Sequence, residues 1–127
     1  EPVWFGCDVG QSSDRKSGVM DTDLYDMATL VGVEFTMDKR QRIMTRESAA
    51  THAMTLAGVD VIDGRPVRWK VENSWGDENG QKGYFVMTDP WFDEYTFEAV
   101  INKKYLSEDI ARLYETEPEV LPYYLPF

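Results

Sequence analysis

The segment from residue 50 to residue 73 constrains the fold more than any other part of this 127-residue chain. Residues 50–62 form a long run of small apolar and β-branched side chains, and residues 63–66 (DGRP) follow as a turn signal. Residues 67–73 (VRWKVEN) then alternate strictly between two faces. Such alternation is typical of a β-strand with one buried face. The segment therefore predicts an antiparallel β-hairpin.

The predicted hairpin brings two polar residues together. Asn73 is in phase with the apolar side chains of its strand, so it ends the buried face and needs a hydrogen-bond partner. The midpoint between positions 52 and 73 falls next to the turn. Antiparallel pairing about this turn places His52 within a residue or two of the position opposite Asn73. We therefore expect the two side chains to lie within hydrogen-bonding reach.

A histidine held by an asparagine and covered by a tryptophan suits the activation of a thiol. A thiol nucleophile needs a base that exchanges its proton and a group that orients this base. His52 and Asn73 meet these two needs, and Trp75 follows closely enough to keep water away. Each residue also has a plain structural interpretation, because the only histidine is in phase with Met54 and Asn73 could simply end its strand. Their pairing across one hairpin favours the catalytic interpretation.

Cys7 is the first candidate for the nucleophile, but two observations argue against it. It lies in residues 3–9 (VWFGCDV), an apparent buried strand, whereas activated thiols usually sit at helix N-termini. Papain-like enzymes separate the cysteine from the histidine by ~130 residues or more, and His52 is much closer to Cys7 than that. We therefore interpret Cys7 as a buried core residue. A single cysteine is also typical of a reducing, cytosolic compartment.

The composition predicts a folded chain and disfavours some classes of binding partner. The hydrophobic fraction of 43% and aromatic fraction of 13% predict a folded core. The net charge of −10 and the isoelectric point near 4.4 disfavour nucleic acid or an anionic membrane as a direct partner. The basic cluster at residues 39–42 (KRQR) is typical of a solvated loop or helix face. No apolar run approaches ~20 residues, and no ligand spacing or glycine-rich loop indicates a metal or a cofactor.

Weaker patterns outline the rest of the chain. We expect strands at residues 3–9, 33–37, 84–88 and 98–105, with polar loops at residues 10–18 and 76–83. We expect short helices capped by Asp21 or Thr22, by Asp89 and by Ser107, the first of them stopped by Gly32. Residues 38–48 are ambiguous.

The end of the chain carries three prolines after Thr116 and cannot be helical. We therefore divide the chain into a β-rich subdomain at residues 1–117 and an extended tail at residues 118–127. The chain also opens without Met, in an apparent core strand, which favours a fragment of a longer protein.

Several motifs resemble one family. Residues 72–76 (ENSWG), with Gly83-Tyr84 downstream, are similar to the papain-superfamily pattern around the catalytic asparagine. Residues 1–10 (EPVWFGCDVG), 51–54 (THAM) and 69–76 (WKVENSWG) resemble, more narrowly, bleomycin hydrolase and bacterial aminopeptidase C. Matches at residues 87–89, 91–92, 117–118 and 121–122 extend the likeness over nearly the whole chain.

The resemblance implies a fold and a set of site residues. The fold would be α+β: the C-terminal, β-rich, antiparallel barrel-like half of a papain-like cysteine peptidase, with short peripheral helices. His52 would match the catalytic histidine, Asn73 the orienting asparagine and Trp75 the tryptophan that shields their hydrogen bond. The nucleophilic cysteine and the glutamine of the oxyanion hole would lie upstream of this chain. Cys7 would be a framework residue, in agreement with the argument from spacing.

The resemblance also implies an activity and an assembly. Family members are cytosolic homohexamers that act as aminopeptidases on peptides with a free N-terminus. Their C-terminal carboxylate captures the amino group of the substrate, a role that would belong here to Phe127. The chain departs from the family at this point, because residues 123–127 (YYLPF) replace the usual tryptophan-containing, small-residue ending. The resemblance alone therefore does not carry the amine-capture role to Phe127.

Two hypotheses follow for the chain as a whole. In the first, it is the C-terminal portion of a cysteine aminopeptidase that needs no cofactor, and it is inactive alone because the nucleophile lies upstream. In the second, it is a separately encoded or decayed domain that serves only in assembly or binding. In either case we expect the chain alone to show no thiol-dependent hydrolysis. Without its other half, we expect an exposed apolar face that favours self-association.

Overall fold

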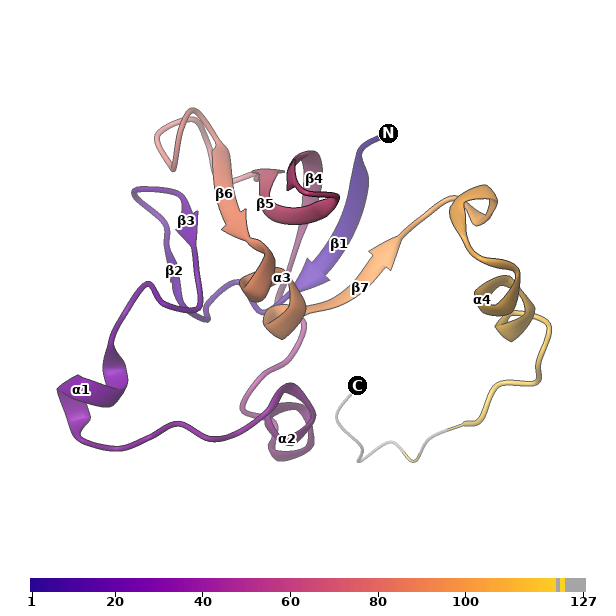
Figure 1. Ribbon diagram of the computed structural model, residues 1–127, viewed down its shortest axis with the longest axis horizontal. Helices are drawn as coiled ribbons and strands as arrows, with labels where there is room; N and C mark the ends of the chain where they lie inside the picture. The colour runs from indigo at the N-terminus through magenta and orange to yellow at the C-terminus, as the bar shows by residue number, and fades with distance from the viewer. Residues whose placement is uncertain (121, 123–127) are drawn as a thin grey trace.

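The computed structural model describes residues 1–120 and 122, which contain one seven-stranded sheet (Figure 1). The strands are β1 (Val3–Cys7), β2 (Ser13–Asp14), β3 (Val19–Met20), β4 (His52–Ile62), β5 (Arg65–Glu72), β6 (Tyr84–Thr88) and β7 (Thr96–Val100). Their order is β2-β3-β6-β5-β4-β1-β7, and only β3 and β6 pair in parallel. The sheet curls into a half-barrel, which confirms the expected β-rich, barrel-like fold.

Short helices lie around this sheet. They are α1 (Met27–Val31), α2 (Lys39–Thr45), α3 (Asp89–Tyr95), the 3₁₀ helix η1 (Lys103–Tyr105) and α4 (Glu108–Leu113). Only α3 buries a residue, Trp91, whereas α1, α2, η1 and α4 bury none. Figure 1 shows α1, α2 and α4 at the periphery of the molecule. The expected short peripheral helices are therefore present.

The β4–β5 hairpin forms as the alternation predicts. Asp63 and Gly64 both have positive φ, 51° and 76°, as a two-residue type I′ turn requires. Thr55 pairs with Glu72 in the antiparallel ladder. On β5, Val71 is fully buried while the residues on either side of it are exposed. The apolar face of the strand therefore packs into the core, in the register that the turn sets.

The core packs where α3 crosses the sheet. Its fully or nearly fully buried apolar residues are Phe5, Cys7, Met20, Met54, Val71, Phe85, Met87 and Trp91. The Trp91 indole N–H donates to the carbonyl oxygen of Gln11 at 2.8 Å, and the Trp69 indole donates to Asp89 at 2.9 Å. Phe92 stacks on Trp69 with ring centroids 5.0 Å apart. These contacts hold α3 on the sheet, and each large apolar side chain buried here contributes roughly 1.5–3 kcal/mol.

The N-terminal half differs from the sequence prediction in several places. Residues 10–18, expected to be a loop, contain β2, which pairs with β3. The first helix is confined to α1, because Asp26 rather than Asp21 or Thr22 caps it; Gly32 ends it as expected. Residues 33–37 form no strand and pair with none. The ambiguous residues 38–48 contain α2, which starts at a capping box formed by Asp38 and Gln41.

The C-terminal half differs in two places. Thr88 rather than Asp89 is the N-cap of α3, and its hydroxyl accepts a hydrogen bond from the backbone N–H of Trp91. The expected strand at residues 98–105 is instead β7 followed by η1, because Asn102 caps a new turn. The predicted strand β6 and the Ser107 cap of α4 are confirmed.

The basic cluster at residues 39–42 is only partly solvated, contrary to the sequence interpretation. The Lys39 ammonium donates to the carbonyl oxygens of Asp93 and Thr96 at 2.6 and 2.5 Å. The Arg42 guanidinium pairs with Glu94 and lies 5.2 Å from the ring centroid of Tyr95. Partial burial lowers the pKa of Lys39 from its usual value. These cations therefore attach α2 to the C-terminal end of α3, where carbonyl groups point outward.

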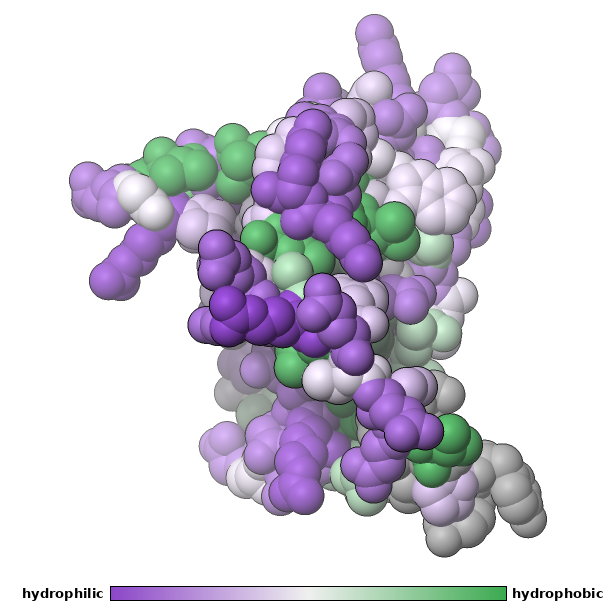
Figure 2. All heavy atoms as spheres, turned by 90° about the vertical axis from the view of Figure 1, so that its right-hand side faces the viewer, coloured by the Kyte–Doolittle hydropathy of each residue, from purple (hydrophilic) through white to green (hydrophobic). Residues whose placement is uncertain are grey.

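The surface carries many large apolar side chains. Figure 2 shows apolar areas between polar side chains on the face that lies to the right in Figure 1. Exposed apolar residues of β4, β7 and their surroundings include Trp4, Val59, Val61, Ile62, Val100 and Ile101; those of α1, the segment after it and α4 include Leu30, Val33, Phe35, Leu113 and Tyr114. The described part of the chain thus exposes apolar surface, as expected for a chain that packs against a further partner.

Candidate active site

The β4–β5 hairpin brings His52 and Asn73 together. β4 begins at His52, and Asn73 follows the last residue of β5. Since Thr55 pairs with Glu72, continuing the ladder would set Asn73 opposite Met54, two residues from His52. The ring nitrogen Nε2 of His52 lies 2.9 Å from Oδ1 of Asn73. The hydrogen bond that the sequence predicts is therefore confirmed.

A neighbouring backbone bond fixes the proton on the imidazole. The backbone N–H of Ser74 donates to Oδ1 of Asn73 at 2.8 Å, so this atom of the amide must be the oxygen. The oxygen is an acceptor, and its second contact is Nε2 of His52. Nε2 must therefore carry a hydrogen. In neutral His52 the nitrogen left to accept a proton is Nδ1.

Asn73 sits in a closed environment. The residue is 9% exposed, and its backbone N–H donates to the carbonyl oxygen of Gly83 at 3.0 Å, which closes the loop at residues 74–83. The amide nitrogen Nδ2 is buried without a hydrogen-bond partner among the described residues. Burial removes competing water from the His52–Asn73 bond and so strengthens it.

Trp75 packs against the imidazole of this pair. Its indole stacks on the imidazole of His52 with centroids 4.8 Å apart and planes 29° apart. The buried ring of Phe85 supports Trp75 edge-on at 5.9 Å. Asn79 donates to the Trp75 carbonyl oxygen at 2.7 Å and accepts a bond from Arg15 Nε at 2.6 Å. The indole is thus held against the imidazole by packing on its ring and by hydrogen bonds on its backbone.

Cys7 is next to His52 in the sheet but cannot act as a thiolate. The two residues pair across β1 and β4, and the thiol contacts the backbone carbonyl oxygen of His52 at 3.7 Å. Cys7 is fully buried. Burial, with a smaller effect from the charge of Asp8, raises the pKa of Cys7 to about 12. The interpretation of Cys7 as a core residue is confirmed.

A buried carboxylate fixes the chain just before His52. Asp8 is 7% exposed and accepts hydrogen bonds from the Ser48 hydroxyl at 2.8 Å and the Thr51 hydroxyl at 3.3 Å. Gln11 also donates to it at 3.2 Å. This network was not among the sequence predictions, although an acidic residue in an apolar segment was a usable signal. Arg15 and Asn79 were not predicted either, because 64 positions separate them and the sequence offers no signal that they meet.

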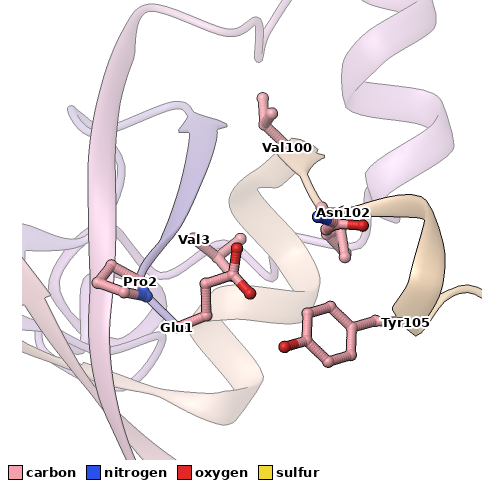
Figure 3. Close-up of a pocket in the computed structure, with 7 residues that line it drawn as sticks. Glu1, Pro2, Val3, Val100, Asn102 and Tyr105 are labelled. Carbon is pink, nitrogen blue, oxygen red and sulfur yellow. The ribbon is translucent and has the colours of Figure 1, made fainter.

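A hollow of about 360 Å³ lies away from these residues, between the start of β1 and η1 (Figure 3). Its lining consists of Glu1, Pro2, Val3, Val100, Ile101, Asn102 and Tyr105. Figure 3 shows the Tyr105 ring facing the Glu1 side chain across it. None of the residues around His52 belongs to this lining, so the hollow is separate from the candidate site.

The remaining site predictions concern Phe127, metals and membranes. Phe127, the candidate for amine capture, lies outside the described residues. Within the described residues, no group of three or more His, Cys, Asp and Glu side chains could hold a metal ion. No helix in this part of the chain is long and apolar enough to cross a membrane.

Known proteins resemble this chain throughout its length. Residues 1–127 match the sequence model of the peptidase C1-like family. Aminopeptidase C of Streptococcus thermophilus is 51% identical over 122 residues, which are 95% of this chain and 27% of that protein. Aminopeptidase C of Lactococcus lactis subsp. cremoris is 53% identical over 122 residues, again 95% of this chain and 28% of that protein.

Solved structures give the same result. The crystal structure of PepW from Lactobacillus rhamnosis superposes with a TM-score of 0.92 at 50% sequence identity. The match covers 99% of this chain and 29% of PepW. The chain therefore spans less than a third of the length of these relatives.

Proposed function

Because the chain belongs to the peptidase C1-like family, we propose that it supplies the histidine and asparagine of a cysteine-type aminopeptidase whose nucleophilic cysteine lies elsewhere in a longer protein. The bond of 2.9 Å between His52 Nε2 and Asn73 Oδ1 carries this proposal. The greater length of the relatives, and their name, aminopeptidase C, support it. Cys7 does not compete for the role of nucleophile, because it is buried and protonated.

In the proposed reaction, His52 works through Nδ1. This nitrogen accepts the proton of the cysteine thiol and leaves a thiolate. The thiolate attacks the carbonyl carbon of the scissile peptide bond, and His52 delivers the proton to the leaving amine as the C–N bond breaks. Water then attacks the thioester, one of its protons passes through His52 to the departing thiolate, and the free acid is released.

Asn73 and Trp75 act on His52 rather than on the substrate. Asn73 accepts the Nε2–H bond in both charge states of the imidazole, so the ring keeps its orientation while Nδ1 gains and loses a proton. The stacked Trp75 covers the ring and limits access of water to the bond. Both are therefore positioning residues.

We extend the proposal to the parent enzyme. It would be a bleomycin hydrolase-like, cytoplasmic homohexamer that acts on peptides with a free N-terminus. The motifs at residues 1–10 and 69–76 and the single cysteine support this assignment. Residues 1–117 would form the β-rich subdomain of that enzyme, and residues 118–127 its extended tail.

The test uses the complete enzyme that contains this chain and an aminoacyl 4-nitroanilide substrate. His52→Ala should lower kcat by at least about 10³-fold, because it removes the only proton carrier. Asn73→Ala should cause a smaller loss, since the imidazole remains but is no longer oriented. Cys7→Ala should keep the activity of the parent enzyme. An unchanged rate in the His52 variant would contradict the catalytic assignment and favour a domain that serves only in assembly or binding.

A further inference from the structure

Arg15 lies on the same indole that covers His52. It belongs to the turn between β2 and β3, and its guanidinium carbon lies 4.8 Å from the ring centroid of Trp75. The imidazole of His52 is also 4.8 Å from this indole. Arg15 is therefore within about 10 Å of the imidazole, next to the candidate site.

The structure holds Arg15 in place at two points. Its Nε donates to Oδ1 of the buried Asn79 at 2.6 Å, and its carbonyl oxygen accepts from the backbone N–H of Gly80 at 3.2 Å. Asn79 in turn donates to the Trp75 carbonyl oxygen. A guanidinium oriented through Nε presents the hydrogens of its two terminal nitrogens as a fork.

This fork is free to bind an anion. Arg15 is exposed, and within the described residues its terminal nitrogens form no hydrogen bond or ion pair. Asp77 and Glu78 lie on the same loop as Asn79, yet neither forms an ion pair with Arg15. An unpaired, fixed cation is notable in a chain of net charge −10. A carboxylate is the anion whose geometry best matches a guanidinium fork.

The proposed role of His52 determines which part of a substrate lies near Arg15. The proton on Nδ1 passes to the leaving amine, so the residue after the scissile bond must lie beside His52. A hydrogen bond of about 3 Å to this amine and the roughly 5 Å from a glutamate nitrogen to its carboxylate together span about 8 Å, and a further hydrogen bond to the guanidinium matches the separation of up to about 10 Å between the imidazole and Arg15. The α-carboxylate of the same residue lies about 2.5 Å from the nitrogen, so it spans a shorter distance.

We propose that Arg15 forms a carboxylate subsite on the leaving-group side of the scissile bond. This inference rests on the proposed peptidase function. The carboxylate belongs either to an acidic side chain of the residue after the scissile bond or to the C-terminus of a dipeptide substrate. Arg15 touches the substrate but takes no part in the bond changes, so its effect is on selectivity.

The test compares three substrates of the complete enzyme that share one N-terminal residue. Their leaving groups are glutamate amide, glutamine amide and glutamine with a free carboxylate. We expect kcat/KM to favour one or both carboxylate substrates over glutamine amide by about three- to fivefold, as an exposed ion pair would give. A preference for the glutamate amide substrate identifies the side-chain carboxylate as the bound group, and a preference for glutamine with a free carboxylate identifies the C-terminus. The preference should decline as salt is raised.

Variants separate a subsite from a structural role. Arg15→Gln should remove the preference, and Arg15→Lys should keep part of it, because the charge remains but the fork is lost. Lys16→Gln is the matched control, since Lys16 is the adjacent exposed cation; it should leave all three rates unchanged. Equal losses on all three substrates in Arg15→Gln would show that Arg15 only supports Trp75 and would overturn the subsite.

The outcomes also separate this inference from the proposed function. Hydrolysis of all three substrates, with ratios that Arg15→Gln does not change, overturns the subsite and leaves the peptidase function intact. If the wild-type enzyme hydrolyses neither the nitroanilide nor any of the three substrates, both the subsite and the proposed peptidase function are overturned. Circular dichroism of Arg15→Gln verifies that the variant is folded before its ratios are compared.

Discussion

The two ring nitrogens of His52 differ because Asn73 Oδ1 already binds one of them. Ser74 identifies the amide oxygen, the oxygen assigns the hydrogen to Nε2, and Nδ1 is left to accept a proton. In the proposed reaction, a single backbone donor thus determines which ring nitrogen carries the proton. The sequence predicted the His52–Asn73 contact but not this tautomer, because the tautomer depends on the local path of the chain after β5.

The tautomer can be measured directly, because His52 is the only histidine. We expect ¹⁵N NMR of the neutral imidazole to show hydrogen on Nε2 and a bare Nδ1. Asn73→Ala removes the acceptor and should give a mixture of tautomers with faster exchange of the ring hydrogen. Asn73→Asp keeps an acceptor oxygen and should keep the Nε2–H form. A wild-type spectrum with hydrogen on Nδ1 would contradict the assignment.

The buried thiol of Cys7 makes the fold sensitive to high pH. The thiol of the unfolded chain ionises near pH 9.0, whereas in the folded chain burial raises the pKa to about 12. Between these values the unfolded state has lost a proton that the folded state keeps. The free energy of unfolding should therefore fall as the pH rises above 9, by up to about 1.4 kcal/mol per pH unit from this group. More than about one unit below pH 9 the thiol contributes almost no slope, because it is protonated in both states.

Urea unfolding at several pH values between 8 and 10.5 measures this slope. Lysines and tyrosines also titrate in this range, so the comparison is with Cys7→Ala, which keeps those groups and loses the thiol. The variant should show a shallower decline than the wild type. A thiol reagent should also react slowly with the native wild type and quickly in urea. Equal slopes in the two proteins would exclude a buried thiol with a raised pKa.

Among the elements, the loop at residues 76–83 matters most for the site, because it carries Asn79 and touches the turn that carries Arg15. Gly18 and Gly80 lie so close that a Cβ on Gly18 would come within 2.6 Å of the Cα of Gly80. A Cβ on Gly80 would meet the Tyr84 carbonyl oxygen and the ring of Phe85. This close packing brings the loop and the β2–β3 turn together, so Arg15, Asn79 and Trp75 can contact one another.

Two alanine substitutions test the importance of this contact. Gly80 and Gly64 both have positive φ, 58° and 76°, but nothing lies within 4 Å of a Cβ on Gly64. Gly64→Ala should cost about 1–2 kcal/mol from backbone strain alone. Gly80→Ala adds overpacking of about 1–3 kcal/mol and should shift the NMR signals of Trp75 and His52. Equal losses of stability in Gly80→Ala and Gly64→Ala, measured by thermal unfolding, would show that the loop rearranges around the added Cβ without a further loss of stability.

The elements also show how far the sequence determines the fold. The hairpin of β4 and β5 was predictable because its period, its turn residues and its length all favour one structure. The β2–β3 pair was not, because strands of two residues carry no periodicity, and β3 is stabilised by pairing with the distant strand β6. The expected strand at residues 33–37 has β-forming residues but no neighbour to pair with. Local conformational preference determines the secondary structure where that preference is strong, and pairing with other strands determines it elsewhere.

The same distinction applies to the site. His52, Asn73 and Trp75 lie on one hairpin and the loop after it, so short-range geometry was enough to bring them together. Arg15 and Asp8 join the site through strand pairing across the sheet, which a sequence alone does not fix. The start of α2 was predictable, because Asp38 and Gln41 have the spacing of a capping box.

At the scale of the whole molecule, the described part of the chain contains the proposed base, His52, and the residues that hold it, but no group able to attack a carbonyl as a thiolate. Burial raises the pKa of the single cysteine to about 12, so its thiol stays protonated at neutral pH. That thiol is also fully buried and bonded to a backbone oxygen. The chain spans 27–29% of its relatives, so the missing group belongs, in the proposed enzyme, to the remainder.

We therefore expect the 127-residue chain alone to hydrolyse no aminoacyl nitroanilide above the buffer rate, although its hairpin places His52 and Asn73 correctly. The NMR measurement of the His52 tautomer on the same sample shows that the site is formed, so inactivity cannot be attributed to unfolding. The complete enzyme, assayed in parallel, should turn over the substrate and lose activity with a thiol reagent. Turnover by the chain alone that Cys7→Ala abolishes would contradict this division of the active site, because it would make the buried thiol the nucleophile.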